Sequence, residues 1–379
     1  MSVARRSFLK LGAAAAIAPG LTPWRKVLAG PAVVGASPYG ALGVPDANGV
    51  ALPSGFTARL LATSGDAVGS SGYAWHGAPD GGACFEHADD GWVYVSNSEL
   101  NGTRGGVGVL RFDGDGAISA AYAVLAGTKW NCAGGATPWR TWLSCEEHRS
   151  GYVWECDPFG PGQGTPRPGL GRFPHEAAAV DPTTSYVYLT EDDYGSRFYR
   201  FRPDRWGELG SGVLEAASWQ SNGTLKWLSV PADRPYRGRD TTGFARGEGA
   251  WFSSGVVYFC TTADNRVWAH DVNRGTLEVI YDAATLGPAA PLHDPDNVTV
   301  HATSGDIYVA EDADDLQLVL LADRNGQRIA APFLQLYGHD GSEITGPAFS
   351  PDGSRLYYSS QRGRDRKKGM TFEVSGPFR

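Results

Sequence analysis

The chain has 379 residues, enough for two average domains or one large repetitive domain, and 42% of them are hydrophobic. Its 51 glycines, 24 prolines and 12 tryptophans indicate a turn-rich all-β protein and argue against a helical one. The formal charge is −8, and it becomes −13 without the first 29 residues, which hold five basic residues and no acid. Such an acidic surface argues against nucleic acid as a partner.

The first 29 residues have the pattern of an export signal. Arg5 and Arg6 precede an apolar stretch, and residues 27–29 offer a cleavage site, so the segment resembles a twin-arginine signal. An amphipathic terminal helix is the alternative. Beyond this segment we find no run of about 18 apolar residues, so we expect no stable membrane anchor. We predict export by the twin-arginine machinery to the periplasm or the cell exterior.

Residues 30–53 are punctuated by Pro and Gly and are predicted to be an extended segment, and residues 54–379 to be one domain. In this domain a β-rich run with polar or acidic residues at its end is followed by a turn and a second β run. The first runs are 92–99, 140–147, 186–193, 256–264, 306–312 and 355–361. The returning runs are 107–112, 152–155, 197–201, 266–270, 316–321 and 370–374.

The spacing of these six repeats predicts the fold. The first runs start about 46 to 50 residues apart, except for one interval of about 70 that includes an insertion at about 206–239. A period near 45 residues with several strands per unit is typical of a β-propeller blade. We therefore predict a six-bladed all-β propeller. A jelly roll or sandwich is the alternative, but it does not require a repeat of this length.

Each repeat also has a short strand before its first run, and that strand opens with an unusual residue. In an antiparallel blade the start of this strand and the end of the next lie at the same edge. The opening residues are Cys132, Glu176, Glu248, Asp296 and Glu343. The acids at the ends of the first runs are Glu99, Glu147, Glu191 and Glu311. We therefore predict that these side chains gather at one mouth of the central channel.

Clustered carboxylates repel one another unless they are protonated or bind cations, and we favour cations. Oxygen ligands suit calcium, whereas the Cys132 thiolate favours iron or zinc. The chain lacks the His and Cys spacings of a conventional zinc site. The alternative to metal binding is that the acids accept hydrogen bonds from backbone amides only and that Cys132 is simply a small buried residue. Among the five cysteines, Cys145 and Cys156 flank a predicted hairpin and are candidates for a disulfide.

Arg246 lies two residues before Glu248 and is therefore expected near the same channel mouth. A guanidinium beside bound cations forms an anion site, and its planar fork suits phosphate oxygens. An ion pair between Arg246 and Glu248 is the simpler alternative. The basic segment 362–368 is predicted to be a solvated hairpin loop, with anion steering as the alternative.

Several of these stretches together resemble the PhoX-type alkaline phosphatases. The residues that carry the resemblance are the leader and the segments 131–135, 142–147, 173–176, 244–248 and 295–297. The resemblance implies a six-bladed propeller that hydrolyses phosphate esters with two ferric ions, three calcium ions and a bridging oxo group. It implies that Cys132 is a thiolate iron ligand and that Arg246 contacts phosphate. The metal ligands that it implies in addition are Glu147, Glu176, Glu248 and Asp296.

We therefore predict a monomeric, exported, metal-dependent phosphatase that acts on small phosphate monoesters or diesters. The chain is shorter than the large phosphatases of that family, so it would be a shortened member. Two alternatives belong to other classes. A calcium-dependent lactonase-like propeller would use the axial acids but not Cys132 or Arg246, and a non-catalytic binding module would use calcium only to hold its blades together.

Overall fold

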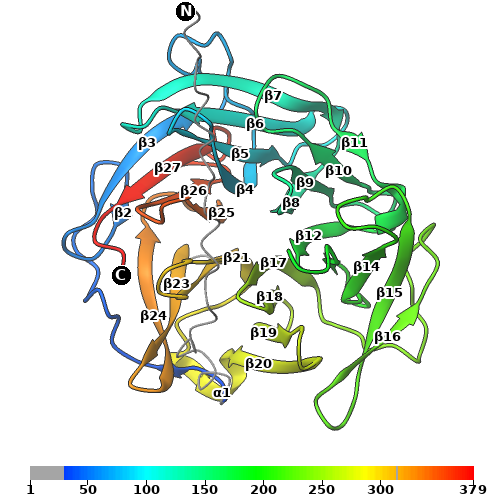
Figure 1. The fold of residues 1–379 in the computed structure, drawn as a ribbon. Coiled ribbons are helices and arrows are strands. Elements are labelled where there is room, and N and C mark those ends of the chain that lie inside the picture. Colours follow the sequence, from blue (N-terminus) through cyan, green and yellow to red (C-terminus); the bar gives the residue numbers. More distant parts are fainter. Residues whose placement is uncertain (1–29, 313–314) are drawn as a thin grey trace, which may run out of the picture.

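The computed structural model describes residues 30–312 and 315–379, so the predicted export signal lies outside the described residues. In this part of the chain six β-sheets are arranged around a central axis, as Figure 1 shows. The chain is thus the predicted six-bladed β-propeller. No helix among the described residues is long and apolar enough to cross a membrane.

The strands of each blade pair in antiparallel fashion, apart from β1, which pairs in parallel at the outer edge of blade 5. The innermost strands of successive blades contact one another around the axis. Blade 1 contains β4 (Pro79–Glu86), β5 (Trp92–Ser98), β6 (Gly105–Phe112) and β7 (Ile118–Thr128). Blade 2 contains β8 (Asn131–Ala136), β9 (Trp142–Glu146), β10 (Val153–Cys156) and β11 (Thr165–Pro166). Blade 3 contains β12 (His175–Val180), β13 (Val187–Glu191), β14 (Tyr199–Pro203), β15 (Gly212–Trp219) and β16 (Leu225–Ser229).

The other three blades follow the same order, with additions from the N-terminal part of the chain. Blade 4 contains β17 (Gly247–Ser253), β18 (Val256–Thr261), β19 (Arg266–Asp271) and β20 (Thr276–Asp282), followed by α1 (Ala283–Leu286). Blade 5 contains β21 (Pro295–Val300), β22 (Ile307–Glu311), β23 (Gln317–Arg324) and β24 (Gln327–Leu336), with β1 (Val33–Val34) and β2 (Val50–Ala51) paired to β24. Blade 6 contains β25 (Ile344–Phe349), β26 (Arg355–Ser360), β27 (Met370–Ser375) and β3 (Thr57–Thr63).

Two predicted features take a different form. The stretch 206–239 includes β15, the fourth strand of blade 3, so the additional structure is the fifth strand β16 and the loop after it. All five cysteines have free thiols, and the proposed disulfide between Cys145 and Cys156 is therefore absent. The register explains this, because Cys145 pairs with Val153 whereas Cys156 pairs with Trp142.

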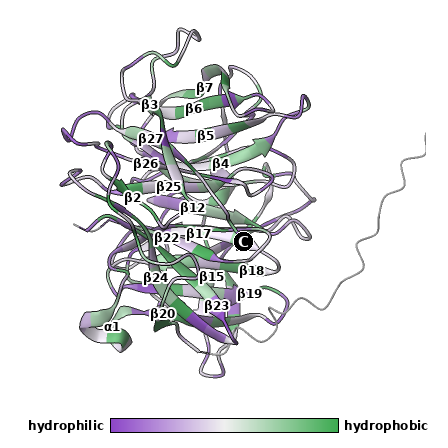
Figure 2. Ribbon diagram, turned by 90° about the vertical axis from the view of Figure 1, so that its left-hand side faces the viewer, coloured by the Kyte–Doolittle hydropathy of each residue, from purple (hydrophilic) through white to green (hydrophobic). Residues whose placement is uncertain are grey.

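The core lies between neighbouring blades. Phe198 of blade 3 stacks on Phe259 of blade 4 with ring centroids 4.4 Å apart, and Tyr94 of blade 1 stacks on Tyr357 of blade 6 at 5.0 Å. Figure 2 shows hydrophobic stretches along the strands, β4 and β18 among them. Burial of this apolar surface between sheets provides the main stabilisation of the fold.

The ring is closed by pairing of β3 with β27, which joins the N-terminal part of the propeller to its last blade. Glu373, which is 2% exposed, accepts hydrogen bonds from Arg59 at 3.0 Å, Arg355 at 2.8 Å and Tyr357 at 2.9 Å. One buried carboxylate therefore links both strands of the closure to the core of blade 6.

Replacement of Glu373 by Ala is expected to lower the free energy of unfolding by about 1–3 kcal/mol, because the buried Tyr357 hydroxyl loses its acceptor. Thermal unfolding measures the effect. Glu208, whose side chain is 60% exposed, provides the control, since its replacement by Ala should leave the melting temperature unchanged. Equal melting temperatures for both variants would contradict this account of ring closure.

Candidate metal centre

A cavity of about 170 Å³ opens at one mouth of the central channel. Most of the predicted site residues line it: Glu99, Cys132, Glu147, Glu176, Arg246, Glu248, Asp296 and Glu343. They come from all six blades, and Asp192, Thr262, Asp312 and Arg362 complete the lining. The repeat thus brings together side chains that are more than 200 residues apart in the sequence.

A β-bulge turns the second residue of the innermost strand toward the axis in each of the first five blades. Two residues of the inner strand there oppose one residue of its neighbour, and the first of the two is the site residue. A bulge bends its strand and redirects the side chain. The residues that these bulges present are Asp80, Cys132, Glu176, Glu248 and Asp296.

A repeated backbone hydrogen bond brings the second ring of residues beside the first. In each of these blades the residue after the second strand donates its N–H to the carbonyl two positions before the bulge, at 2.8 to 3.1 Å. The bonds run from Glu99 to Ala78, from Glu147 to Trp130, from Asp192 to Pro174, from Thr262 to Arg246 and from Asp312 to Asp294. Except for Pro174, the accepting residues have a positive φ between 41° and 57°, which orients these carbonyls.

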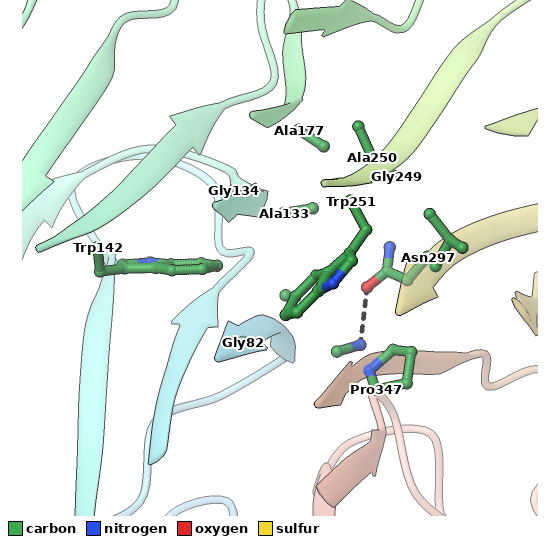
Figure 3. A pocket seen from close by; sticks show the side chains of 13 residues that line it. Gly82, Ala133, Gly134, Trp142, Ala177, Gly249, Ala250, Trp251, Asn297 and Pro347 are labelled. Carbon is green, nitrogen blue, oxygen red and sulfur yellow. Dashed lines mark hydrogen bonds between the residues drawn. The ribbon is translucent and has the colours of Figure 1, made fainter. Parts of the chain in front are cut away.

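The second residue of each bulge closes the channel below the cavity. Figure 3 shows four of these residues, Ala133, Ala177, Gly249 and Asn297, around the axis. They pack tightly, since a Cβ on Gly249 would lie only 2.7 Å from the Cα of Asn297. Asn297 Oδ1 accepts the N–H of Gly346 from blade 6 at 2.7 Å. The remaining space of about 20 Å³ holds no more than about one water molecule, so a solute reaches the cavity from one side only.

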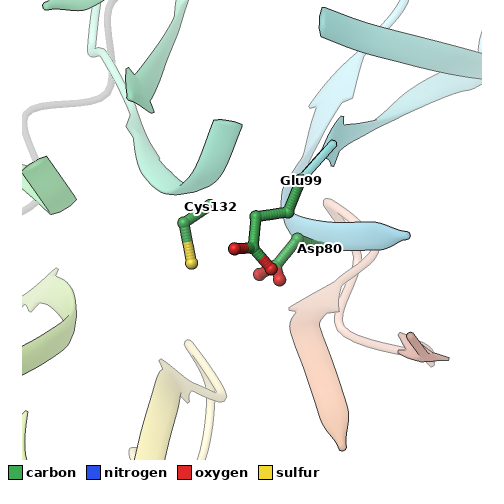
Figure 4. Close-up of side chains that lie close together, drawn as sticks. All are labelled: Asp80, Glu99 and Cys132. Carbon is green, nitrogen blue, oxygen red and sulfur yellow. The ribbon is translucent and has the colours of Figure 1, made fainter. Parts of the chain in front are cut away.

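Seven ligand-type side chains form one continuous row, and all of them except Asp80 line the cavity. They make three groups in which one ligand atom from each member lies within 4.8 Å of the others. The groups are Asp80, Glu99 and Cys132; Cys132, Glu147 and Glu176; and Glu176, Glu248 and Asp296. Figure 4 shows the first group, with the two carboxylates beside the thiol. Cys132 and Glu176 each belong to two groups, so neighbouring cations would share a ligand.

The position of Cys132 is fixed by Asn97 from the neighbouring blade. The fully buried Asn97 amide donates to the carbonyls of Cys132 at 3.0 Å and Ala133 at 2.7 Å. Its oxygen accepts from Trp142 Nε1 and Ser144 Oγ, both at 2.9 Å. Both N–H donors and both acceptor positions of this amide are therefore used to hold the bulge that presents the thiol.

Two arginines line the same cavity, and each pairs with a carboxylate outside the row of seven. Arg246 forms a bidentate pair with Asp192, with Nε–Oδ1 and Nη2–Oδ2 both at 2.7 Å, while Glu248 Oε1 lies 3.4 Å from Nη2. Arg362 lies 2.7 Å from Glu343. Arg362 is thus part of the cavity wall and not only of a solvated loop, as the sequence had suggested for segment 362–368.

Glu191 and Glu311 do not reach the cavity, which corrects their assignment as site residues. Glu311 accepts the backbone N–H groups of His293 at 2.7 Å and Gln317 at 2.9 Å, and Glu191 binds Arg237. Each is the last residue of its strand and is directed into the adjoining loop. The next residue in each blade, Asp192 or Asp312, lines the cavity instead.

Sequence reasoning missed Asp80, Asp192, Asp312 and Arg362. The sequence held a signal for Asp80, because Pro79 and Asp80 repeat the Pro-Asp pair that opens β21. It also held one for Asp192, because the pair Glu191 and Asp192 aligns with Glu146 and Glu147, and the second acid of each pair lies at the site. Arg362 has no such counterpart, because no other blade has an arginine two residues after the end of its second strand.

The site is electrostatically unfavourable without cations. Glu176 is 1% exposed, and its Oε1 has no hydrogen-bond partner in the described structure. Burial, and after it the charges of Asp296 and Glu248, raise the pKa of Glu176 well above its ordinary value. Burial also raises the pKa of the Cys132 thiol and moves that of Glu248 to about 8. Bound cations would compensate these charges, so the residues fit a cluster of metal ions.

The raised pKa values predict how stability depends on pH. Because the Glu248 pKa rises from 4.5 to about 8 on folding, the folded state binds more protons than the unfolded state between these values. The melting temperature of the metal-free protein should therefore fall as pH rises from about 4.5 to about 8, and less steeply for Glu248→Gln. Thermal unfolding after chelation and after metal loading tests this. The same slope in both preparations would contradict it.

Comparison with known proteins places the chain in a family. The model of the family described as alkaline phosphatase PhoX matches residues 86–151 and 147–284, more than half of the chain. The chain therefore belongs to the PhoX alkaline phosphatase family, which confirms the resemblance seen in the sequence and makes the chain a phosphoric ester hydrolase by family. No curated protein matches it.

Solved structures with similar folds include PhoX of Pseudomonas fluorescens, determined in complex with vanadate, a transition state analogue. It has 17% identity and a TM-score of 0.70, with 92% of this chain and 98% of that chain covered. A gluconolactonase from Xanthomonas campestris has 14% identity and a TM-score of 0.53, with 90% and 99% covered. At these identities the likenesses establish the propeller fold alone.

Proposed function

We propose that the protein hydrolyses small phosphate monoesters at a cluster of ferric iron and calcium ions held by the row of seven side chains. The observation that carries this proposal is the row itself: three overlapping ligand groups beside two arginines in one cavity. The chain's membership of an alkaline phosphatase family supports the reaction class.

The ligand atoms of the three groups differ, and this difference indicates which metal each group would bind. Cys132 belongs to two of the three groups, and a thiolate with carboxylates suits iron. The third group, Glu176, Glu248 and Asp296, offers only oxygen ligands and suits calcium. When bound, these cations would polarise the phosphoryl group and neutralise the charge that develops in the transition state.

The chain's own residues would bind and orient the ester. Asp192 holds the Arg246 guanidinium by two parallel hydrogen bonds, and the remaining N–H groups suit the oxygens of a phosphoryl group. The cavity of about 170 Å³ is small beside the 300–1,000 Å³ typical of a site that encloses a drug-sized ligand. It would admit the phosphoryl group and leave the alcohol outside, so we expect little selectivity for the alcohol.

The proposal predicts that the Cys132→Ala variant loses its iron and that its kcat/KM falls at least about 100-fold, because neighbouring residues cannot replace the thiolate as a ligand. Metal analysis and hydrolysis of p-nitrophenyl phosphate measure both effects on protein purified from an exporting host. Cys156→Ala is the matched control, because Cys156 is buried in the same blade and lies outside the cavity. Wild-type protein that hydrolyses the ester without iron or calcium would refute the metal assignment.

We also propose export by the twin-arginine route. The leader with Arg5 and Arg6 supports it, and so does membership of the PhoX family. Replacing both residues by Lys should retain the full-length protein inside the cell, because this route reads the arginine pair. Immunoblots of cell fractions measure the distribution. Unchanged export of the Lys variant would assign the leader to another route.

A further inference from the structure

The loop between β16 and β17 places Arg237 against Glu191, the last residue of β13 in blade 3. Arg237 Nη2 lies 2.6 Å from Glu191 Oε1, and Nη1 lies 2.9 Å from Glu191 Oε2. The Glu191 side chain is fully buried, whereas that of Arg237 is 35% exposed. This loop accounts for part of the long interval in the repeat, and it provides none of the seven candidate metal ligands.

Glu146 and Glu311 occupy the same repeat position and show what is particular to blade 3. All three glutamates accept the backbone N–H six residues further along the chain, at 2.9 to 3.1 Å. Glu146 and Glu311 accept their second N–H from the backbone of Lys129 and His293. Glu191 accepts instead from the guanidinium of Arg237, so a charged side chain of the added loop has taken the place of a backbone contact.

Arg237 forms ion pairs with the residues on both sides of Asp192. Besides its bonds to Glu191, its Nη2 lies 3.2 Å from Asp193 Oδ2. Asp192 between them forms the bidentate pair with Arg246, whose backbone N–H donates to the Asp193 carbonyl at 3.3 Å. The short segment 191–193 is thus fixed between two guanidinium groups, one in the added loop and one in the cavity.

This arrangement has an energetic consequence. Without Arg237, the buried Glu191 carboxylate would lose its only charged partner among the described contacts, and the Asp193 side chain would keep the N–H of Gly195 at 3.1 Å but lose its contact with the added loop. Asp192 would then be held less firmly, and the direction of the Arg246 fork depends on Asp192. A bidentate contact with phosphate requires that direction to be fixed before binding.

We propose that Arg237 is a positioning residue that acts through Asp192 and Arg246 to set the affinity of the site for phosphate. The inference rests on the proposed function, in which Arg246 contacts the phosphoryl group. It gives the added loop of blade 3 a role in substrate binding without contact with the substrate.

The test is a double-mutant cycle on metal-loaded protein, with calorimetric binding of inorganic phosphate as the main readout. Arg237→Ala should raise the phosphate Kd by about threefold to tenfold and raise KM for p-nitrophenyl phosphate more than it lowers kcat. In the Arg246→Ala background the same change should have no further effect on the Kd. Iron and calcium content should stay at the wild-type level.

Two further variants keep the test decisive. If Arg237→Ala alone does not fold, Arg237→Ala combined with Glu191→Gln removes the buried charge and should show the same rise in Kd. Arg234→Ala is the matched control, since its side chain is 70% exposed and its ion-pair partner is the exposed Asp233. It should leave the Kd unchanged.

An unchanged Kd for Arg237→Ala, or equal effects of the change in both backgrounds, would overturn the inference while leaving the proposed function intact. If Arg246→Ala itself binds phosphate as tightly as the wild type, the assignment of Arg246 fails, and the inference fails with it. If the wild type does not hydrolyse p-nitrophenyl phosphate, but the effects of Arg237→Ala and Arg246→Ala on the phosphate Kd are coupled as predicted, only the proposed reaction is refuted.

Discussion

Mutual repulsion among buried acids at the channel mouth is the constraint on which the rest of this structure depends. Glu176, Glu248 and Asp296 are each less than 10% exposed and lie close enough to share one ion. Burial of so many like charges is costly unless cations or protons compensate them. A fold that carries these acids must therefore hold them rigidly, and the ring of blades supplies that rigidity from every side.

The bulges connect the fold to the chemistry. An ordinary strand alternates its side chains between two faces, so its first residue would face a neighbouring blade. The two-residue bulge directs one side chain into the cavity and leaves a small residue, such as Ala133 or Gly249, to close the channel. The same irregularity thus places the ligands and seals the floor below them.

The sequence was sufficient for the fold and for most of the cavity. Six copies of a strand pair, spaced by about 46 to 50 residues except for one interval of about 70, predicted a propeller. The chemistry of Cys132, Glu176 and Arg246 indicated a site for metals and an anion. These are local properties, since the repeat fixes which edge a residue occupies. The alignment with strand ends failed at Glu191 and Glu311, because one position along a strand changes the direction of the side chain.

What the sequence determined by itself is the number of blades, the edge at which the acids gather and the kinds of ligand available there. Only the tertiary structure decided which acid of each adjacent pair faces the axis, and that Arg362 lines the cavity while Arg237 supports it from behind. The physical reason is that these choices depend on contacts between residues far apart in the sequence, such as Arg246 with Asp192, which are 54 residues apart, and Arg237 with Glu191, which are 46 apart. No local pattern encodes such pairs, because a guanidinium can reach any carboxylate that the fold brings near it.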